Sequence, residues 1–399
     1  MKYRQDLRSG RELSALGFGC MRFPKVFGGA IDIKKTDALI MDAIKNGVNY
    51  FDTAWMYPGS EDALGTILAN NGARKQVYIA TKLPVLFCKN GADFDRYFNE
   101  SLKRLKTDYI DYYLMHMLTD FASWEKLKSF GIENWITQKK KSGEIKQIGF
   151  SFHGSLGEFI KILNDYDWEF CQIQYNYSDE NYQAGVGGLK AAAAKKIPVI
   201  IMEPLLGGKL ANNLPNAASQ VFNKANPARS VVGWALGWLW DQSEVTVVLS
   251  GMSTQNQLTE NLAIAQDFEA GCLTENDRAV YLEVKNVFNA SYKIHCTGCN
   301  YCMPCPKGVN IPGCFSAYNS SYLISHIEGF KQYLTSTAAT SVENHCASMC
   351  VECGKCEEHC PQHLPIRNNI KAVRRRLEPL YFRFILSVTR GVLKLIRSE

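Results

Sequence analysis

The sequence predicts an α/β protein: a closed (β/α)8 barrel, or TIM barrel, followed by a smaller cysteine-rich domain. Up to residue 285, eight short apolar runs rich in β-branched residues alternate with longer helix-like segments. Such alternation is typical of parallel β-α-β units, and eight units in about 250 residues fit a closed barrel. Eight of the 14 cysteines lie in two tight groups, at 296–305 and 350–360, which indicates a second domain.

The expected strands follow one another along the chain. A hairpin with its turn at Ser9 and Gly10 precedes the barrel. An open doubly wound sheet is the alternative fold, but it usually carries a GxGxxG turn after its first strand, and this sequence has none there. We expect domains at 1–285 (barrel), 286–370 (cysteine-rich) and 371–399 (basic helix). The barrel strands are predicted at 15–19, 48–52, 77–81, 109–115, 145–151, 171–176, 198–202 and 245–251.

Composition and charge narrow the function classes. The 399 residues are 46% hydrophobic and 21% charged, which is ordinary for a globular protein. Because no long apolar stretch or apolar signal core is found, we expect neither a membrane-spanning helix nor secretion. Fourteen cysteines then favour metal or redox chemistry in the cytoplasm over disulfides. The net charge of +6 resides in residues 371–399, so the neutral body gives no support for nucleic-acid binding.

Titratable side chains follow three neighbouring predicted strands. Asp52 and Tyr57 come after the second strand, Lys82 after the third and His116 after the fourth. The C-terminal ends of barrel strands share one face, where the chemistry of such barrels gathers. One Asp or Lys at such a place is more often a solvated or packing residue. Together, however, an ammonium held by a carboxylate would tune a phenol as a proton donor, and an imidazole would orient a carbonyl oxygen. The set predicts carbonyl reduction by an external hydride donor.

The first 285 residues resemble the aldo-keto reductase family. The matching segments are LGFGCMRFP, FDTAWMYPGSE, IATKLP, YYLMH, IGFSFHG, IQYNY, PLLGGKL and GMSTQNQLTENL. The resemblance implies reduction of a small aldehyde or ketone with NAD(P)H. It implies a catalytic tetrad of Asp52, Tyr57, Lys82 and His116. It also implies nucleotide-binding positions near Ser151, Gln174, Leu205, Gly207, Glu260 and Asn261.

Two departures from the family pattern bear on the cofactor. Phe152 and His153 follow Ser151, where the family often places an Asn. Gln257 stands near the position at which many relatives place an Arg or Lys for a 2′-phosphate. The sequence therefore leaves NADPH, NADH and a flavin open as redox cofactors.

The cysteine groups predict two 4Fe–4S clusters. The second group is a C-x2-C-x2-C-x3-C-P run, and the first is one residue shorter before its last cysteine. One cluster, a zinc site or structural thiols are the alternatives. Cys314 and Cys346 are expected to be core thiols, although they could substitute as ligands. In two-cluster ferredoxins the fourth cysteine of each run binds the other cluster, which predicts the sets Cys296, Cys299, Cys302, Cys360 and Cys350, Cys353, Cys356, Cys305.

The segments around the cysteine groups are expected to be helical. The 44 residues between the groups resemble the all-helical dicluster ferredoxins of respiratory iron-sulfur subunits. Residues 380–396 predict a basic amphipathic helix. We expect this helix to pack on the protein, with peripheral membrane contact or docking to an acidic partner as alternatives.

The two predicted domains carry electrons in different ways. Nicotinamide transfers two electrons as hydride, whereas a cluster passes one at a time, and a flavin is the usual mediator. The sequence therefore predicts a carbonyl reductase whose clusters exchange electrons with a ferredoxin-like or other redox partner. The alternatives are a nicotinamide-sensing module and an electron-transfer subunit that docks to a larger complex.

Overall fold

The chain divides into two compact units. The computed structural model describes residues 1–212, 214–291, 293–294, 296, 302–339, 344–360 and 364–382. One unit is formed by Met1–Leu210 with Arg229–Thr274, and the other by Ala211–Ala228 with Glu275–Glu399. The boundary predicted at 285 falls inside helix α12 (Glu275–Ser291), which belongs to the second unit. The predicted basic helix at 380–396 lies almost entirely outside the described residues.

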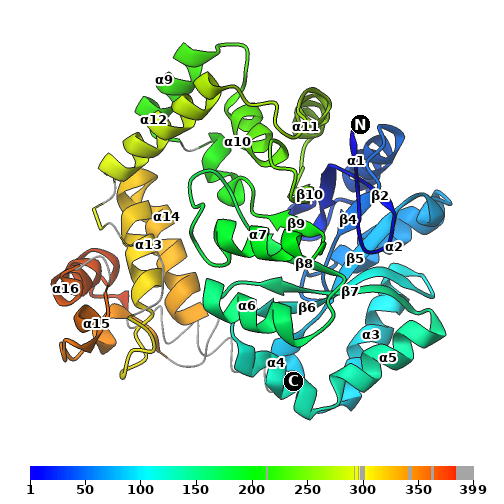
Figure 1. Cartoon of the computed structure of the whole chain (residues 1–399), viewed down its shortest axis with the longest axis horizontal. Coiled ribbons are helices and arrows are strands. Elements are labelled where there is room, and N and C mark those ends of the chain that lie inside the picture. Colours follow the sequence, from blue (N-terminus) through cyan, green and yellow to red (C-terminus); the bar gives the residue numbers. More distant parts are fainter. Residues whose placement is uncertain are drawn as a thin grey trace. The chain divides into compact units, whose positions relative to one another are not determined.

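The first unit is the predicted closed barrel of eight parallel strands (Figure 1). Around the barrel the strands are hydrogen-bonded in the order β10-β3-β4-β5-β6-β7-β8-β9. The antiparallel hairpin of β1 (Tyr3–Gln5) and β2 (Glu12–Ser14) precedes them, as predicted. The barrel strands are β3 (Leu16–Gly19), β4 (Tyr50–Asp52), β5 (Tyr78–Leu83), β6 (Ile110–Leu118), β7 (Ile145–Phe152), β8 (Phe170–Gln174), β9 (Val199–Met202) and β10 (Val245–Ser250).

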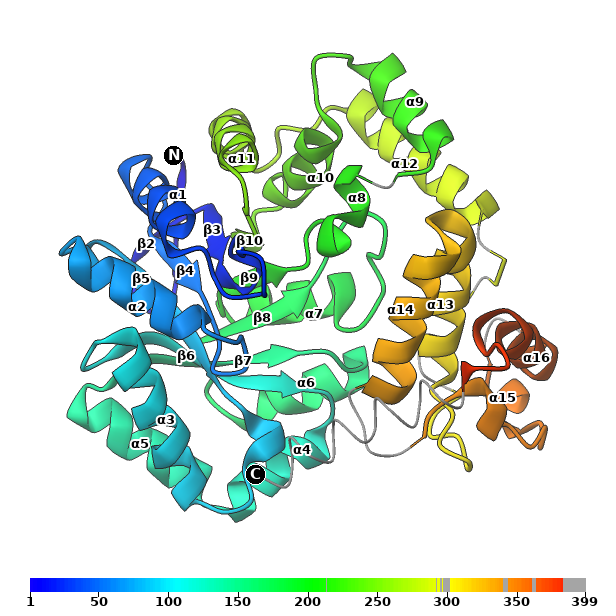
Figure 2. The same cartoon turned by 180° about the vertical axis from the view of Figure 1, so that it is seen from behind.

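Helices surround these strands, as Figures 1 and 2 show. Several begin at a side chain that accepts a hydrogen bond from the first turn; Asp32 does so for α1 and Thr254 for α11. The helices of this unit are α1 (Ile33–Lys45), α2 (Ser60–Asn70), α3 (Ala92–Leu105), α4 (Phe121–Ser129), α5 (Ile132–Ser142), α6 (Leu156–Asp165), α7 (Gly185–Ala194), α10 (Val231–Trp240) and α11 (Gln255–Asp267). The short helix α8 (Lys209–Asn212) spans the point in the sequence, after Leu210, at which the chain passes from the first unit to the second.

The alternation of side chains along each strand decides what the barrel interior contains. Large apolar residues such as Tyr50, Tyr112 and Phe170 fill its N-terminal part, together with Leu13 from the hairpin. Because successive side chains point to opposite faces of a strand, the residue two places later points inward as well. That step leads to a polar layer at the C-terminal ends of the strands, formed by Asp52, Lys82, His116 and Gln172.

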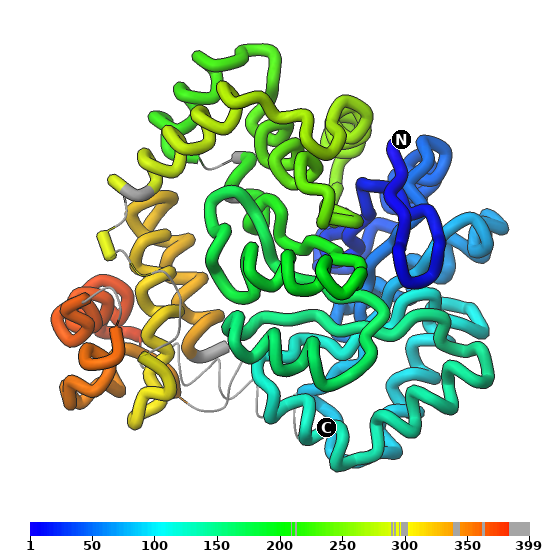
Figure 3. Tube along the Cα trace, viewed as in Figure 1, coloured from blue at the N-terminus to red at the C-terminus, as the bar shows by residue number. Residues whose placement is uncertain are grey.

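The second unit is helical over its described residues, as predicted; Figure 3 traces the chain through both units. Its core includes the fully buried thiols of Cys314 and Cys346. No helix in the described part of the chain is long and apolar enough to cross a membrane. The helices are α9 (Asn216–Ala225), α12, α13 (Ile311–Leu323), α14 (His326–Leu334), α15 (Lys355–Glu358) and α16 (Ile366–Leu377).

Candidate functional site

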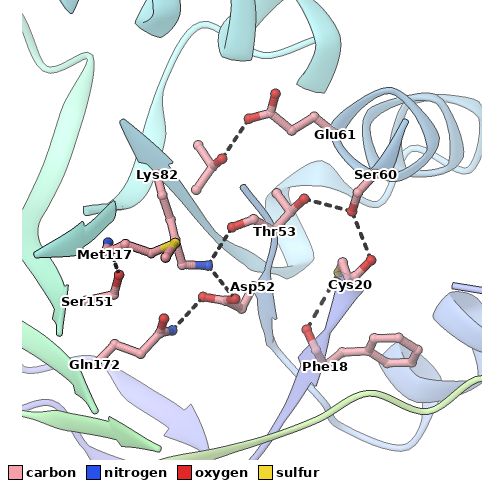
Figure 4. Close-up of polar contacts among 11 residues, drawn as sticks. Phe18, Cys20, Asp52, Thr53, Ser60, Glu61, Lys82, Met117, Ser151 and Gln172 are labelled. Atoms are coloured by element: carbon pink, nitrogen blue, oxygen red, sulfur yellow. Dashed lines mark hydrogen bonds and ion pairs between the residues drawn. The ribbon is translucent and has the colours of Figure 1, made fainter. Parts of the chain in front are cut away.

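A buried ion pair forms the centre of the polar layer (Figure 4). The Nζ of Lys82 lies 2.6 Å from Oδ1 of Asp52 and donates to the carbonyl oxygen of Thr53 at 2.7 Å. Both side chains are almost wholly buried, with 1% and 5% of their surface exposed. Gln172 completes the group, because its Nε2 donates to Oδ2 of Asp52 at 2.8 Å. The Asp52 carboxylate therefore holds the ammonium in place from one side.

Tyr57 also lies beside the ammonium. Its ring centroid is 5.1 Å from Lys82 Nζ. Burial raises the pKa of Tyr57, while the Lys82 ammonium and its hydrogen bond to the phenol oppose that rise. Burial would lower the pKa of Lys82, but Asp52 and Tyr57 together outweigh it, so the pKa is raised. The resting site therefore pairs a protonated phenol with a charged ammonium.

The loop that carries Tyr57 is fixed at both ends. It leaves β4 at Asp52 and enters α2 at Ser60. The Ser60 hydroxyl hydrogen-bonds with the Thr53 hydroxyl at 2.8 Å and donates to the carbonyl oxygen of Cys20 at 3.0 Å (Figure 4). On α2, the buried Glu61 accepts a hydrogen bond of 2.6 Å from the Thr81 hydroxyl on β5. These contacts tie the loop to the adjacent strands β3 and β5.

His116 faces Tyr57 at the end of β6. The two ring centroids are 5.9 Å apart and the rings meet edge to face. Burial, then the charges of Lys82 and His153, hold the pKa of His116 well below its usual range, so the imidazole is neutral at neutral pH. Its Nδ1 is buried and has no hydrogen-bond partner among the described residues. The structure thus brings all four predicted tetrad residues together.

The six predicted nucleotide-binding positions are spread over four strand ends. Ser151 is buried on β7, and its hydroxyl accepts a hydrogen bond of 2.8 Å from the Met117 amide. Asn261, buried on α11, donates to the Ser250 hydroxyl at 2.7 Å. Gln174 ends β8, Leu205 and Gly207 follow β9, and Glu260 lies on α11.

Cys305, Cys350 and Cys356 each pack partly buried against the hydrophobic core of the second unit. The thiols of Cys305 and Cys350 both act on Cys356, whose pKa is raised by burial first and by these thiols in a smaller measure. The Glu352 amide lies 3.4 Å from Cys350 Sγ. Cys305 of the first group is therefore within electrostatic range of Cys356 of the second, and the exchanged ligand sets stay a prediction. Cys299 lies outside the described residues. Within the described residues, no three His, Cys, Asp or Glu side chains converge closely enough to hold a single metal ion.

Comparison with known proteins assigns both units. Residues 15–270 match the model of the aldo/keto reductase family. The chain belongs to this family. Residues 295–364 match a 4Fe-4S dicluster domain, which includes both cysteine groups. The protein is therefore an aldo/keto reductase-family oxidoreductase with a C-terminal 4Fe–4S dicluster domain.

Individual relatives cover the reductase part of the chain. L-galactose dehydrogenase of Arabidopsis thaliana is 29% identical over 291 residues, which are 66% of this chain and 87% of the relative. Aldo-keto reductase yakc [NADP(+)] of Schizosaccharomyces pombe is 26% identical over 49% of this chain and 59% of its own length. The holo form of aldo-keto reductase AKR11C1 from Bacillus halodurans shares the fold, with a TM-score of 0.59, 24% identity and coverage of 71% of this chain and 96% of that one.

Sequence reasoning missed two polar residues at the mouth of this aldo/keto reductase barrel. Gln172 contacts Asp52 and is the register partner of Ser151 on the neighbouring strand. Arg22 follows β3, and its half-exposed guanidinium lies 3.7 Å from the Glu203 carboxylate. A Cβ added at Gly207 or Gly251 would lie 3.0 Å or 3.3 Å from the Arg22 side chain. Period-two alternation could have indicated Gln172, but the Arg22 contacts join segments about 200 residues apart, which no local pattern shows.

Proposed function

We propose that this protein reduces a small aldehyde or ketone at the barrel mouth and that Tyr57 donates the proton. The observation that carries the proposal is the buried Lys82 ammonium, which contacts both the Asp52 carboxylate and the Tyr57 ring. A phenol that is protonated at rest becomes an effective acid as negative charge develops on the carbonyl oxygen beside it. The nearby ammonium then stabilises the phenolate that remains.

The neutral His116 is proposed to orient the substrate. Since Nδ1 is enclosed, Nε2 is the nitrogen left to meet a carbonyl oxygen. A neutral imidazole can donate one hydrogen bond there without competing with Tyr57 as the acid. The edge contact between the two rings supports a common reacting oxygen for both groups. Gln172 acts through Asp52 and is therefore a positioning residue.

The residues of the barrel mouth fit a nicotinamide dinucleotide. Bound NAD(P)H supplies the hydride, and the reaction adds that hydride to the carbonyl carbon and a proton to its oxygen. Gly207 and Gly251 lie against the Arg22 side chain, whose half-exposed guanidinium is a suitable ligand for an anionic phosphate. One relative, the Schizosaccharomyces pombe reductase, carries NADP(+) in its name. Ser151, Gln174, Leu205, Glu260 and Asn261 stay proposed nucleotide contacts.

Replacing the phenol tests the catalytic proposal. Tyr57→Phe keeps the ring that packs against His116 but removes the proton. In single-turnover mixing of NADPH-loaded protein with 4-nitrobenzaldehyde, we expect the rate of NADPH oxidation to fall by about 10²- to 10⁴-fold. Nucleotide affinity, measured by fluorescence titration, should stay within about twofold. Wild-type rates in the variant would contradict the proposed role of Tyr57.

We further propose that the dicluster domain exchanges single electrons with a redox partner during this reduction. The exposed Cys353 supports an exchange site at the protein surface. A flavin at the barrel mouth, which would pair the electrons, stays a prediction. An absorbance spectrum of anaerobically purified protein tests it, because flavin bands would stand apart from the broad cluster shoulder. An electron-transfer subunit without strong catalysis is the second candidate function, and it predicts that Tyr57→Phe leaves electron exchange and physiological function intact.

A further inference from the structure

The Met349–Cys353 segment forms an exposed cysteine loop in the second unit. Of the seven predicted ligand cysteines that the structure describes, Cys353 is exposed, whereas the other six are partly or fully buried. Two apolar neighbours are also open to solvent: Val351 is 58% exposed and Met349 37%. Apolar side chains are characteristic of the fully buried core of a protein–protein interface.

One ion pair joins helix α16 to this loop, and a second joins α16 to the short helix α15 that follows the loop. Lys371 Nζ is 2.7 Å from the carboxylate of Glu352, which stands between Cys350 and Cys353 in the chain. Arg367 Nη2 is 2.7 Å from the carboxylate of Glu357, and its backbone amide donates to the same group at 2.8 Å. The exposed face of α16 that carries Lys371 therefore adjoins the exposed cysteine loop.

That surface is basic. Arg367, Lys371, Arg374 and Arg375 are exposed and recur at intervals of three and four residues, so they share one face of α16. Arg374 and Arg375 have no ion-pair partner within the described part of the chain. Residues 350–377 contain six basic and three acidic side chains, and two of the acidic ones are the Glu352 and Glu357 already paired. The unpaired charge on this face is positive.

We propose that the α16 face and the cysteine loop are the docking surface for a small acidic one-electron carrier protein. The inference rests on the proposed electron exchange and adds the partner class and the place of entry. In the step, the carrier loses one electron, and Cys350, Cys353, Cys356 and Cys305 would hold the 4Fe–4S centre that accepts it. No bond or proton is transferred. The cations would steer the acidic carrier, and Met349 and Val351 would contact it at the centre.

The observations favour a carrier protein over an anionic membrane. A lipid surface would need only the cations, whereas here the cations stand beside the one exposed predicted ligand among those described. Electron transfer requires close approach to that ligand, and the apolar side chains around it are too few to insert into a bilayer. A convex carrier with acidic residues around its own cluster matches both features.

Stopped-flow reduction under anaerobic conditions tests the surface. Reduced plant-type 2Fe–2S ferredoxin is the probe, and bleaching of the cluster absorbance is the signal. For Arg374→Glu with Arg375→Glu, we expect the second-order rate constant at low salt to fall by at least about tenfold. The matched control is Lys34→Glu with Lys75→Glu, an equal charge change at exposed lysines of the barrel, and it should leave the rate within about twofold. Reduced methyl viologen, a small cation, should reduce both variants at least as fast as the wild type, which shows that the centre is intact.

The outcomes separate the proposals. A centre that methyl viologen reduces, but whose reduction by ferredoxin is equal in all variants, overturns the docking surface alone. A wild-type centre that neither donor reduces overturns the proposed electron exchange together with this surface. If the charge reversal abolishes binding to phosphatidylserine vesicles and leaves the ferredoxin rate unchanged, the face binds membranes and the carrier proposal is wrong.

Discussion

Removal of the buried ammonium should damage stability and catalysis together. Lys82→Met keeps the length of the side chain and deletes its charge, which leaves the Asp52 carboxylate buried, with the Gln172 amide as its remaining side-chain donor. Breaking one half of a buried pair costs about 3–5 kcal/mol. For a domain of this size, that corresponds to a fall in Tm of roughly 6–20 °C. Tyr57 also loses its tuning cation, so the single-turnover rate should fall by about 10²- to 10⁴-fold.

The pH range of the measurement follows from the pKa of Lys82. Because that pKa is raised above 10.5, the contribution of the ammonium is fully present below pH 10.5 and is lost only as pH rises further. Thermal unfolding at pH 7 and pH 9 should therefore show the same large loss in the variant. Lys103→Met, at an exposed position on α3, is the matched control and should change Tm by less than about 2 °C.

A double variant separates the two effects. Asp52→Asn combined with Lys82→Met removes the unpaired charge, so most of the lost stability should return, while the catalytic rate should stay low. If Lys82→Met alone melts and reacts like the wild type, the buried pair neither supports the fold nor tunes the phenol, and the reasoning is refuted.

Three other parts of the molecule give expected results of their own. Burial lowers the pKa of His153 to about 4, so the unfolded chain binds the proton more readily and the free energy of unfolding should fall as pH drops from 6.5 toward 4. In urea titrations, His153→Gln should flatten this dependence of the unfolding free energy on pH. An unchanged slope in the variant would contradict the role of His153. Arg22→Ala should raise the Kd for NADP(H) by about tenfold or more in fluorescence titrations, whereas Lys34→Ala should not; equal affinities would remove Arg22 from the nucleotide site. Cys305→Ser should lower iron content from about eight to about four atoms per chain, and loss of all the iron or none of it would speak against the exchanged ligand sets.

The barrel could be predicted because its signals are local. Each strand is a short apolar run between helix-like segments, and the observed β4 and β10 differ from the predicted ranges by two residues or fewer at either end. The four residues of the predicted tetrad could be identified from the sequence for the same reason. Asp52, Lys82 and His116 each occur at or just before the C-terminal end of a strand, and the closure of a parallel barrel brings these ends together.

The boundary between the two units and the position of Arg22 could not be predicted, because both depend on contacts between distant segments. Residues 211–228 interrupt the barrel sequence and belong to the second unit, where Phe222 packs against Tyr281 of α12 with ring centroids 6.2 Å apart. The boundary at 285 was predicted from the distribution of cysteines. Composition of this kind does not indicate that residues 211–228 pack against α12. The position of Arg22 beside Gly207 and Gly251 is likewise set by the order of strands around the barrel. Only the folded chain shows which distant segments lie side by side.

The coupling between the two domains can be measured directly in one experiment. Protein with intact clusters, as purified under anaerobic conditions, is reduced by one-electron donors and mixed with an aldehyde, and cluster oxidation and alcohol formation are followed together. With the proposed flavin to pair the electrons, we expect two electrons from the clusters and two protons to form one alcohol in the wild type, and no alcohol in Tyr57→Phe. Clusters that stay reduced while alcohol forms at the usual rate from NADPH would contradict this expectation.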